Sequence, residues 1–480
     1  MATPRFLATL SVGVASSLTC NSTGLFGLSG ESCRGQGSCA PGAVCLNGTC
    51  VPVCRSDADC PTGNIHRGDA TGASGDSSGD AAGTSGDSRG DAVGDTSPEG
   101  DRERCSDHLT DPNIRTITYE DVAPAGYVLE DNYGGLGVDH DGWVYHCVDG
   151  YYQTVGIEDT AVFRYNSNTD EQQFLGTLRE ISQAEGNLEP GEEIAKIHAP
   201  VLEFNGMMYF GSHSFHDSLE RHRGGHFYSY DLATGGWTDL SKNDPDGVSA
   251  PGQGILTMDV LRNHNKLVGF TYPKGEVITY DLATNRTTNH GRPVSYDPWN
   301  IGRHIIATDS GRVYFAYAEY DTPLYAFNIT LEEFSNTGFN VHYGWLAGST
   351  MNAVGTTAYF VDWLGYLYSI NTDSGVISEV GTIPSTAHAG YSVSWIHGLV
   401  LSNDETTLYT MPRFNINGNH SSYLYEYEIA TGEKRYSAET AEYLVGGAID
   451  NKGNVYYHCH NHHTHVVKLL KLESRCTGLP

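Results

Sequence analysis

The sequence predicts an all-β fold: a seven-bladed β-propeller preceded by a small Cys-rich module and a disordered acidic linker. Three observations predict it. A first-strand signature related to Asp-x-x-Gly-x-Val-Tyr occurs at 139–145, 309–314 and 450–456, and a third-strand signature related to Tyr-Asp-x-x-Thr-Gly occurs at 230–235, 280–285, 371–375 and 427–432. The units that carry these signatures are spaced by roughly 45 to 65 residues, which is typical of four-stranded blades. They begin near Asn132, Lys196, Gly252, Ile301, Gly344, His388 and Tyr443.

The second unit shows the pattern most fully. We expect its strands at 201–204, 207–211, 226–231 and around Trp237, because apolar runs alternate there with Asn-Gly and Ala-Thr-Gly-Gly turns. A propeller often closes by borrowing a strand from the other end of the chain, and the segment 114–119 is placed to complete the last blade.

Four segments are expected along the chain. Residues 1–20 resemble an export signal, which can end in a lipidated Cys20, and residues 21–62 hold six cysteines with almost no apolar run. We expect three disulfides in that module, with zinc as the alternative. Residues 63–104 form a flexible Gly/Asp/Ser-rich linker, and residues 105–480 form the propeller.

Composition limits the partners. The formal net charge of −30 argues against nucleic acid, and no stretch predicts a transmembrane span. An export signal and many cysteines predict a secreted or cell-surface protein, with a possible lipid anchor to an outer membrane, and we expect a monomer. Two further disulfides are predicted, Cys105–Cys476 at the ring closure and Cys147–Cys459 between the first and last blades, with metal ligation as the rival for the second pair.

Topology predicts which side chains can meet. First-strand starts and the loops between second and third strands lie on the same face of a propeller. This rule groups His198, His226, Tyr272 and Arg303 as candidate catalytic residues, with Arg292 in reserve. Arginine can neutralise a uronate carboxylate, while a His or Tyr takes the C5 proton and another protonates the leaving oxygen. The alternative is that such residues only fill the channel with satisfied hydrogen bonds.

These residues also carry a family resemblance. The segments Lys196-Ile197-His198, Gly224-Gly225-His226 and Tyr272-Pro273-Lys274-Gly275 resemble the seven-bladed propeller polysaccharide lyases of the ulvan lyase type. The resemblance implies a His, His, Tyr and Arg site that cleaves an anionic, uronate-containing polysaccharide. His213, Lys274 and Trp363 are expected to contact this substrate.

A second resemblance, to oligogalacturonate lyase-like propellers, points to the histidines of the last blade. His458, His460 and His462 are candidate ligands for Zn²⁺, Mn²⁺ or Ca²⁺. Three hypotheses follow: a secreted or surface-tethered polysaccharide lyase, a non-catalytic glycan- or protein-binding propeller, and a metal-dependent enzyme centred on the last blade.

Overall fold

The computed structural model describes residues 43–46, 49–52, 114–213, 221–295, 302–383, 392–416, 419–440, 443–460 and 468–472. The chain divides into two compact units, Met1–Thr96 and Ser97–Pro480. In the first unit, β1 (Ala43–Leu46) and β2 (Thr49–Pro52) pair antiparallel, with Cys45 opposite Cys50. The export signal, the linker, Cys105 and Cys476 lie outside the described residues, so the predictions for them remain predictions.

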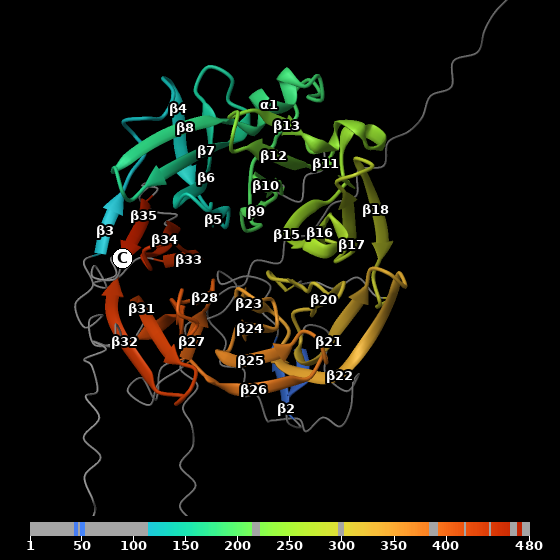
Figure 1. Cartoon of the computed structure of the whole chain (residues 1–480), viewed down its shortest axis with the longest axis vertical. Helices are drawn as coiled ribbons and strands as arrows, with labels where there is room; N and C mark the ends of the chain where they lie inside the picture. The colour runs from blue at the N-terminus through green and yellow to red at the C-terminus, as the bar shows by residue number, and fades with distance from the viewer. Residues whose placement is uncertain are drawn as a thin grey trace, which may run out of the picture. The chain divides into compact units, whose positions relative to one another are not determined.

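The second unit is a β-propeller, in which antiparallel sheets follow one another around a central axis (Figure 1). The first sheets in chain order contain β4 (Tyr127–Asp131), β5 (Leu136–Val138), β6 (Trp143–Tyr152), β7 (Glu158–Asn166) and β8 (Glu171–Thr177); then β9 (Leu202–Phe204), β10 (Met207–Gly211), β12 (Phe227–Asp231) and β13 (Trp237–Asp239); then β15 (Gly254–Leu261), β16 (Lys266–Tyr272), β17 (Val277–Asp281) and β18 (Arg286–Gly291).

The sheets that follow contain β19 (Ile306–Ala307), β20 (Arg312–Phe315), β21 (Tyr320–Asn328) and β22 (Glu333–Tyr343); then β23 (Leu346–Met351), β24 (Thr357–Asp362), β25 (Tyr366–Asn371) and β26 (Ile377–Thr382); then β27 (Ser392–Trp395), β28 (Val400–Leu401), β29 (Thr407–Thr410), β30 (Arg413–Ile416), β31 (Asn419–Glu428) and β32 (Lys434–Thr440). In the second sheet, β9, β10, β12 and β13 are the four strands that the sequence predicted. Each begins within one residue of its predicted start.

The sheet that joins the two ends of the unit contains β33 (Tyr443–Ile449), β34 (Val455–His460), β35 (Lys468–Leu472) and β3 (Ile114–Ile117). β3 pairs antiparallel with β35, with Ile114 opposite Leu472. The segment predicted to pair with the end of the chain does so.

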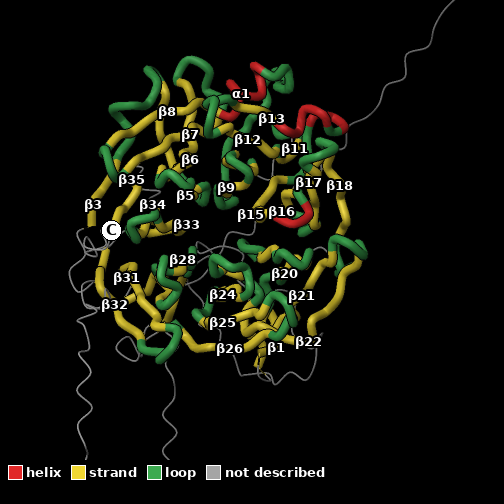
Figure 2. Tube along the Cα trace, in the orientation of Figure 1, coloured by secondary structure: helices red, strands yellow, loops and turns green. Residues whose placement is uncertain are grey.

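Helical insertions are few and short (Figure 2). The α-helix α1 (Leu178–Ala184) is capped at its N-terminus by Thr177, whose side chain accepts a hydrogen bond from the Glu180 amide. In the part of the chain that the structure describes, 3₁₀ turns span Leu240–Asn243, Pro245–Gly247 and Arg262–His264. The short strands β11 (Gly224–Gly225) and β14 (Ala250–Pro251) pair with each other. No helix among the described residues is long and apolar enough to cross a membrane.

The first-strand signature has a physical cause. The Asp139 carboxylate accepts hydrogen bonds from the amides of Asp141 and Trp143 and from the Tyr145 hydroxyl, at 2.9 to 3.0 Å. Asp450 and the Tyr456 hydroxyl repeat this bond at 2.8 Å. One carboxylate therefore caps the turn between two strands and anchors a buried tyrosine six residues later, which explains the spacing in the sequence.

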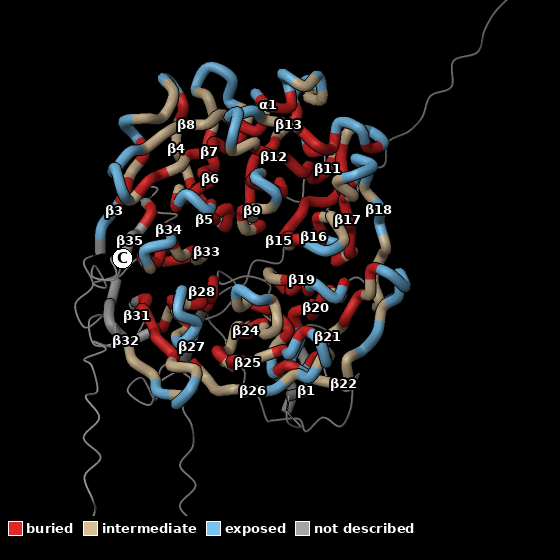
Figure 3. Tube along the Cα trace, viewed as in Figure 1, coloured by how far each residue is buried: buried red, intermediate tan, exposed pale blue. Residues whose placement is uncertain are grey.

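Apolar and aromatic side chains fill the space between neighbouring sheets. Tyr145 and Phe210, from consecutive sheets, belong to one buried cluster, and Phe163 and Leu469 connect the first and last sheets in another. Figure 3 shows this buried layer inside the ring, while outer strands such as β18 and β22 are largely exposed or half-buried. Side-chain packing therefore joins neighbouring sheets around the axis.

Candidate functional site

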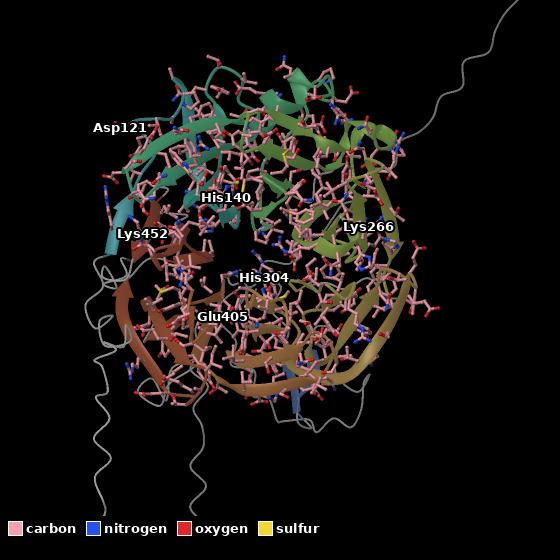
Figure 4. All side chains as sticks on the ribbon, in the orientation of Figure 1. Asp121, His140, Lys266, His304, Glu405 and Lys452 are labelled. Atoms are coloured by element: carbon pink, nitrogen blue, oxygen red, sulfur yellow. The ribbon has the colours of Figure 1, made fainter. Side chains whose placement is uncertain are left out.

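A channel of about 590 Å³ follows the axis of the propeller, lined by the innermost strands. Residues that precede those strands gather at one end, which we call the upper mouth: Tyr133, His198, Arg303, His304 and His397. Residues that follow the same strands, among them Arg262, Asp309 and Asn352, line the opposite end. In Figure 4 the labelled His304 lies beside the central opening. The topological prediction that strand starts share one face holds for the lining residues.

His198 and Arg303 meet at the upper mouth although 105 residues separate them. Arg303 Nη1 donates to His198 Nδ1 at 3.2 Å, so the ring proton of His198 is on Nε2. Burial lowers the pKa of His198 well below its usual value, and the nearby charges of Lys196 and Arg303 lower it further. His198 is therefore a neutral imidazole at neutral pH, with a guanidinium in contact.

His213 and Tyr272 extend this group. The His213 ring meets the His198 ring edge-on at 4.8 Å between centroids, and the Tyr272 ring edge-on at 5.4 Å. The His213 amide donates to the Lys196 carbonyl at 2.6 Å, which holds the backbone of His213 beside that of Lys196. Burial lowers the pKa of His213 well below its usual value, with Lys196 adding to the effect. Two neutral imidazoles and a phenol are thus in consecutive contact.

Lys196 supplies a second basic side chain that the predicted site did not include. Its Nζ lies 3.2 Å from the centroid of the Tyr133 ring, and that ring lies 5.2 Å from the His198 ring. Burial lowers the pKa of Lys196 to about 7, against the opposing effect of the buried Asp149 carboxylate. The sequence could have indicated this residue by its spacing. Lys196 precedes His198 by two residues, and an extended chain places residues two apart on the same side.

Tryptophans and a further histidine border the group on its other side. The Arg303 guanidinium lies 4.9 Å from the Trp345 ring centroid, and Trp345 contacts Trp363 at 4.6 Å. Trp363 lies 6.1 Å from the ring of His397, which lines the channel. Trp363 was predicted as a substrate contact. It lies behind His397, which itself lines the upper mouth.

His226 is in a different environment from His198. Its ring is fully buried; Nδ1 lies 3.1 Å from Asp239 Oδ2 and Nε2 lies 3.5 Å from Glu192 Oε1. Burial alone would lower the pKa of His226, but Asp239 and Glu192 outweigh it and raise the pKa to about 9. Arg223 also pairs with Glu192, at 2.8 Å, and the pKa of Glu192 falls to about 2 because these two partners outweigh burial. The structure therefore makes His226 an enclosed imidazolium and does not bring it into the channel.

The remaining predicted residues lie further out. Lys274 has an exposed side chain, and its carbonyl accepts a hydrogen bond from the reserve candidate Arg292 at 2.7 Å. Neither residue lines the channel. His213 and Tyr272 do not line it either, but they are connected to the upper mouth by the ring contact between His213 and His198.

The predicted Cys147–Cys459 disulfide is wrong. Cys147 is a buried free thiol that packs towards β10 and β12, whereas Cys459 packs towards β28 and β31. Instead, His146 and His458 face each other across the two sheets, with ring centroids 5.2 Å apart. Because successive residues of a strand point to opposite faces, the cysteines one position later point away from each other.

Most of the predicted metal ligands lie outside the described side chains. His458 is buried, the side chain of His460 is not described, and His462 lies outside the described residues. Within the described ranges, no group of three or more His, Cys, Asp or Glu side chains converges as metal ligands would.

Comparison with known proteins identifies no family. No protein-family model matches the chain, and no curated protein matches it. Among solved structures, a chain from "Crystal Structure of Mitotic Checkpoint Complex" aligns with 80% of this chain and 99% of its own length, at 12% identity and a TM-score of 0.45.

Proposed function

We propose that the protein is a polysaccharide lyase that cleaves a uronate-containing polysaccharide by β-elimination at the upper mouth. The observation that carries the proposal is the 3.2 Å hydrogen bond from Arg303 to the neutral imidazole of His198, with His213 and Tyr272 in ring contact beyond it. Elimination from a uronate needs a cation for the carboxylate, a neutral base and a proton donor. Each of these has a candidate in this cluster.

The chemistry assigns a role to each side chain. Arg303 binds the carboxylate of the uronate, which makes the proton on C5 more acidic. As the guanidinium turns to the carboxylate, the His198 Nδ1 lone pair is released and takes the C5 proton. The electron pair left on C5 forms the C4–C5 double bond while the bond from C4 to the glycosidic oxygen breaks. Tyr272 gives its proton to that oxygen, and His213, in contact with both rings, holds base and acid in place.

The proposal has a direct test. Incubation with a series of uronate polysaccharides should produce the ultraviolet absorbance of the unsaturated uronate. His198→Ala and Arg303→Lys should each lower kcat/KM by about 10²-fold or more, the usual loss when a general base or a charge-stabilising group is removed. His342→Ala is the control, because His342 is an exposed residue of the outer strand β22 that bonds Glu379. Full activity in His198→Ala refutes the assignment.

The two alternative functions predict different results. A non-catalytic binding propeller retains the polysaccharide but releases no unsaturated product. An enzyme that depends on a metal at the last-blade histidines loses activity on treatment with a chelator and regains it with Zn²⁺, Mn²⁺ or Ca²⁺.

The proposal also covers the closure of the ring, the location of the protein and its oligomeric state. We infer that β3, β33, β34 and β35 form a seventh blade that closes the ring, on the basis of the β3–β35 pairing. We also propose that the chain is secreted or anchored at the cell surface, where a large polysaccharide is accessible, and that the Cys-rich module and linker tether it there. It would act there as a monomer.

A further inference from the structure

An aromatic corner continues the upper mouth beyond Arg303. Trp345 precedes β23 and Trp363 follows β24, and the Trp363 amide donates to the Trp345 carbonyl at 2.9 Å. The two rings meet at 61° with centroids 4.6 Å apart, and both side chains are only half-buried. Each indole is in contact with a residue that lines the channel, Trp345 with Arg303 and Trp363 with His397.

The corner is physically linked to the proposed reacting group. Arg303 lies between the two parts, because its Nη1 bonds His198 while its guanidinium lies 4.9 Å from the Trp345 ring. On the far side, Trp363 is in ring contact with His397, which lines the channel and supplies polar hydrogen-bonding atoms. An aromatic face beside polar groups matches a pyranose ring, which has apolar C–H faces and hydroxyls around its edge.

We propose that Trp345, Trp363 and His397 form a sugar-binding subsite for the residue linked to C1 of the cleaved uronate, on the side away from the bond that breaks. This inference rests on the proposed function, and it deepens it by stating the direction of the bound chain. The polysaccharide crosses the upper mouth from the first two sheets, where Tyr133 and His198 lie, towards the sheet that contains β23 to β26. The substrate is therefore a polymer or long oligosaccharide rather than a disaccharide.

The two tryptophans have separable tasks. Trp363 stacks on the neighbouring sugar, so it contributes to binding and not to the chemical step. Trp345 lies between Trp363 and Arg303, so it is a positioning residue that holds the guanidinium towards the carboxylate. Loss of Trp363 should therefore appear in KM, and loss of Trp345 should appear in kcat.

Steady-state kinetics on the full chain test this division. Trp363→Ala should raise KM for the polymer by about 5- to 10-fold with little change in kcat, as expected for one aromatic contact. The effect should vanish on the shortest oligosaccharide that is still cleaved, because that substrate leaves the subsite empty. Trp345→Ala should lower kcat, and Trp345→Phe should restore much of it.

Trp143→Ala is the matched control. Trp143 is also half-buried and also carries a guanidinium over its ring, that of Arg164 at 4.2 Å, but it packs against the core cluster that contains Tyr145 and Phe210. Its replacement should leave KM for the polymer unchanged. An unchanged KM in Trp363→Ala, or an equal rise in Trp143→Ala, overturns the subsite.

A binding measurement separates failure of the subsite from failure of the lyase. Polymer titrated into His198→Ala should quench tryptophan fluorescence, and the double variant with Trp363→Ala should lose most of that quenching. If no polysaccharide is cleaved but this quenching is seen with the unmodified chain, the subsite stands and the lyase proposal falls. Absence of any quenching that depends on Trp363 overturns the subsite in either case.

Discussion

Replacement of Asp239 by asparagine should change how the stability of the propeller depends on pH. Asp239 Oδ2 lies 3.1 Å from His226 Nδ1, and both side chains are fully buried. The folded pKa of His226, about 9, is above its unfolded value of 6.5, so the pairing contributes its full stability below pH 6.5 and loses it as the pH rises through 9. A shift of this size corresponds to about 3 kcal/mol of unfolding free energy.

Urea-induced unfolding followed by tryptophan fluorescence measures this contribution. The excess of wild type over Asp239→Asn in unfolding free energy should be larger at pH 6 than at pH 10, by up to about 3 kcal/mol, because Glu192 still faces His226 in the variant. Asp281→Asn is the control: its partner Lys266 is about a quarter exposed, so the difference should stay below about 1 kcal/mol and vary little from pH 6 to 9. If the wild-type and Asp239→Asn curves run parallel over the whole range, His226 is not an imidazolium in the folded protein.

Three more predictions follow from buried groups. Burial lowers the pKa of His146 to about 3, below its unfolded value of 6.5, so wild type should lose stability as the pH falls from 6.5 towards 3, and His146→Phe should lose less in urea unfolding. Gly398→Ala should cost more than about 3 kcal/mol in the same assay, because its Cβ would lie 1.7 Å from the Gly446 carbonyl oxygen, whereas Gly186→Ala, with nothing within 4 Å, should cost only about 1 kcal/mol. Alkylation without reductant should label Cys147 only after denaturation, as mass spectrometry can show, since the thiol is buried and its pKa is raised.

The strand order was predictable because local chemistry repeats. An aspartate that caps a turn must lie at a fixed distance from the tyrosine it anchors, so the spacing of Asp139–Tyr145 and Asp450–Tyr456 along the chain is enough to mark equivalent strands. The pairing of 114–117 with 469–472 also followed, since an unpaired strand at the end of a ring requires a partner.

The grouping at the channel was predictable only in part. Position at a strand start placed His198 and Arg303 at the same mouth, but it could not decide whether the ring of His226 points into the channel or into the core. That choice depends on the partners Asp239 and Glu192, which belong to no repeated motif. Lys196 was overlooked because a buried lysine is recognised by its neighbours and not by its own sequence context.

The side-chain register between sheets was not predictable from matching positions. Cys147 and Cys459 occupy similar places in two Val-Tyr segments, yet the contact is made by His146 and His458 one residue earlier. A strand has a two-residue period, so an error of one position reverses every inference about contacts.

The pairing of β3 with β35 has a consequence for how the chain reaches its final form. The two strands are separated by about 350 residues, so a nascent chain cannot complete this sheet until the residues through Leu472 have left the ribosome. Until then β34 presents an open edge to solvent and to other chains. We expect that truncation before Lys468 gives a protein that aggregates, and that supplying Lys468–Leu472 in trans suppresses the aggregation.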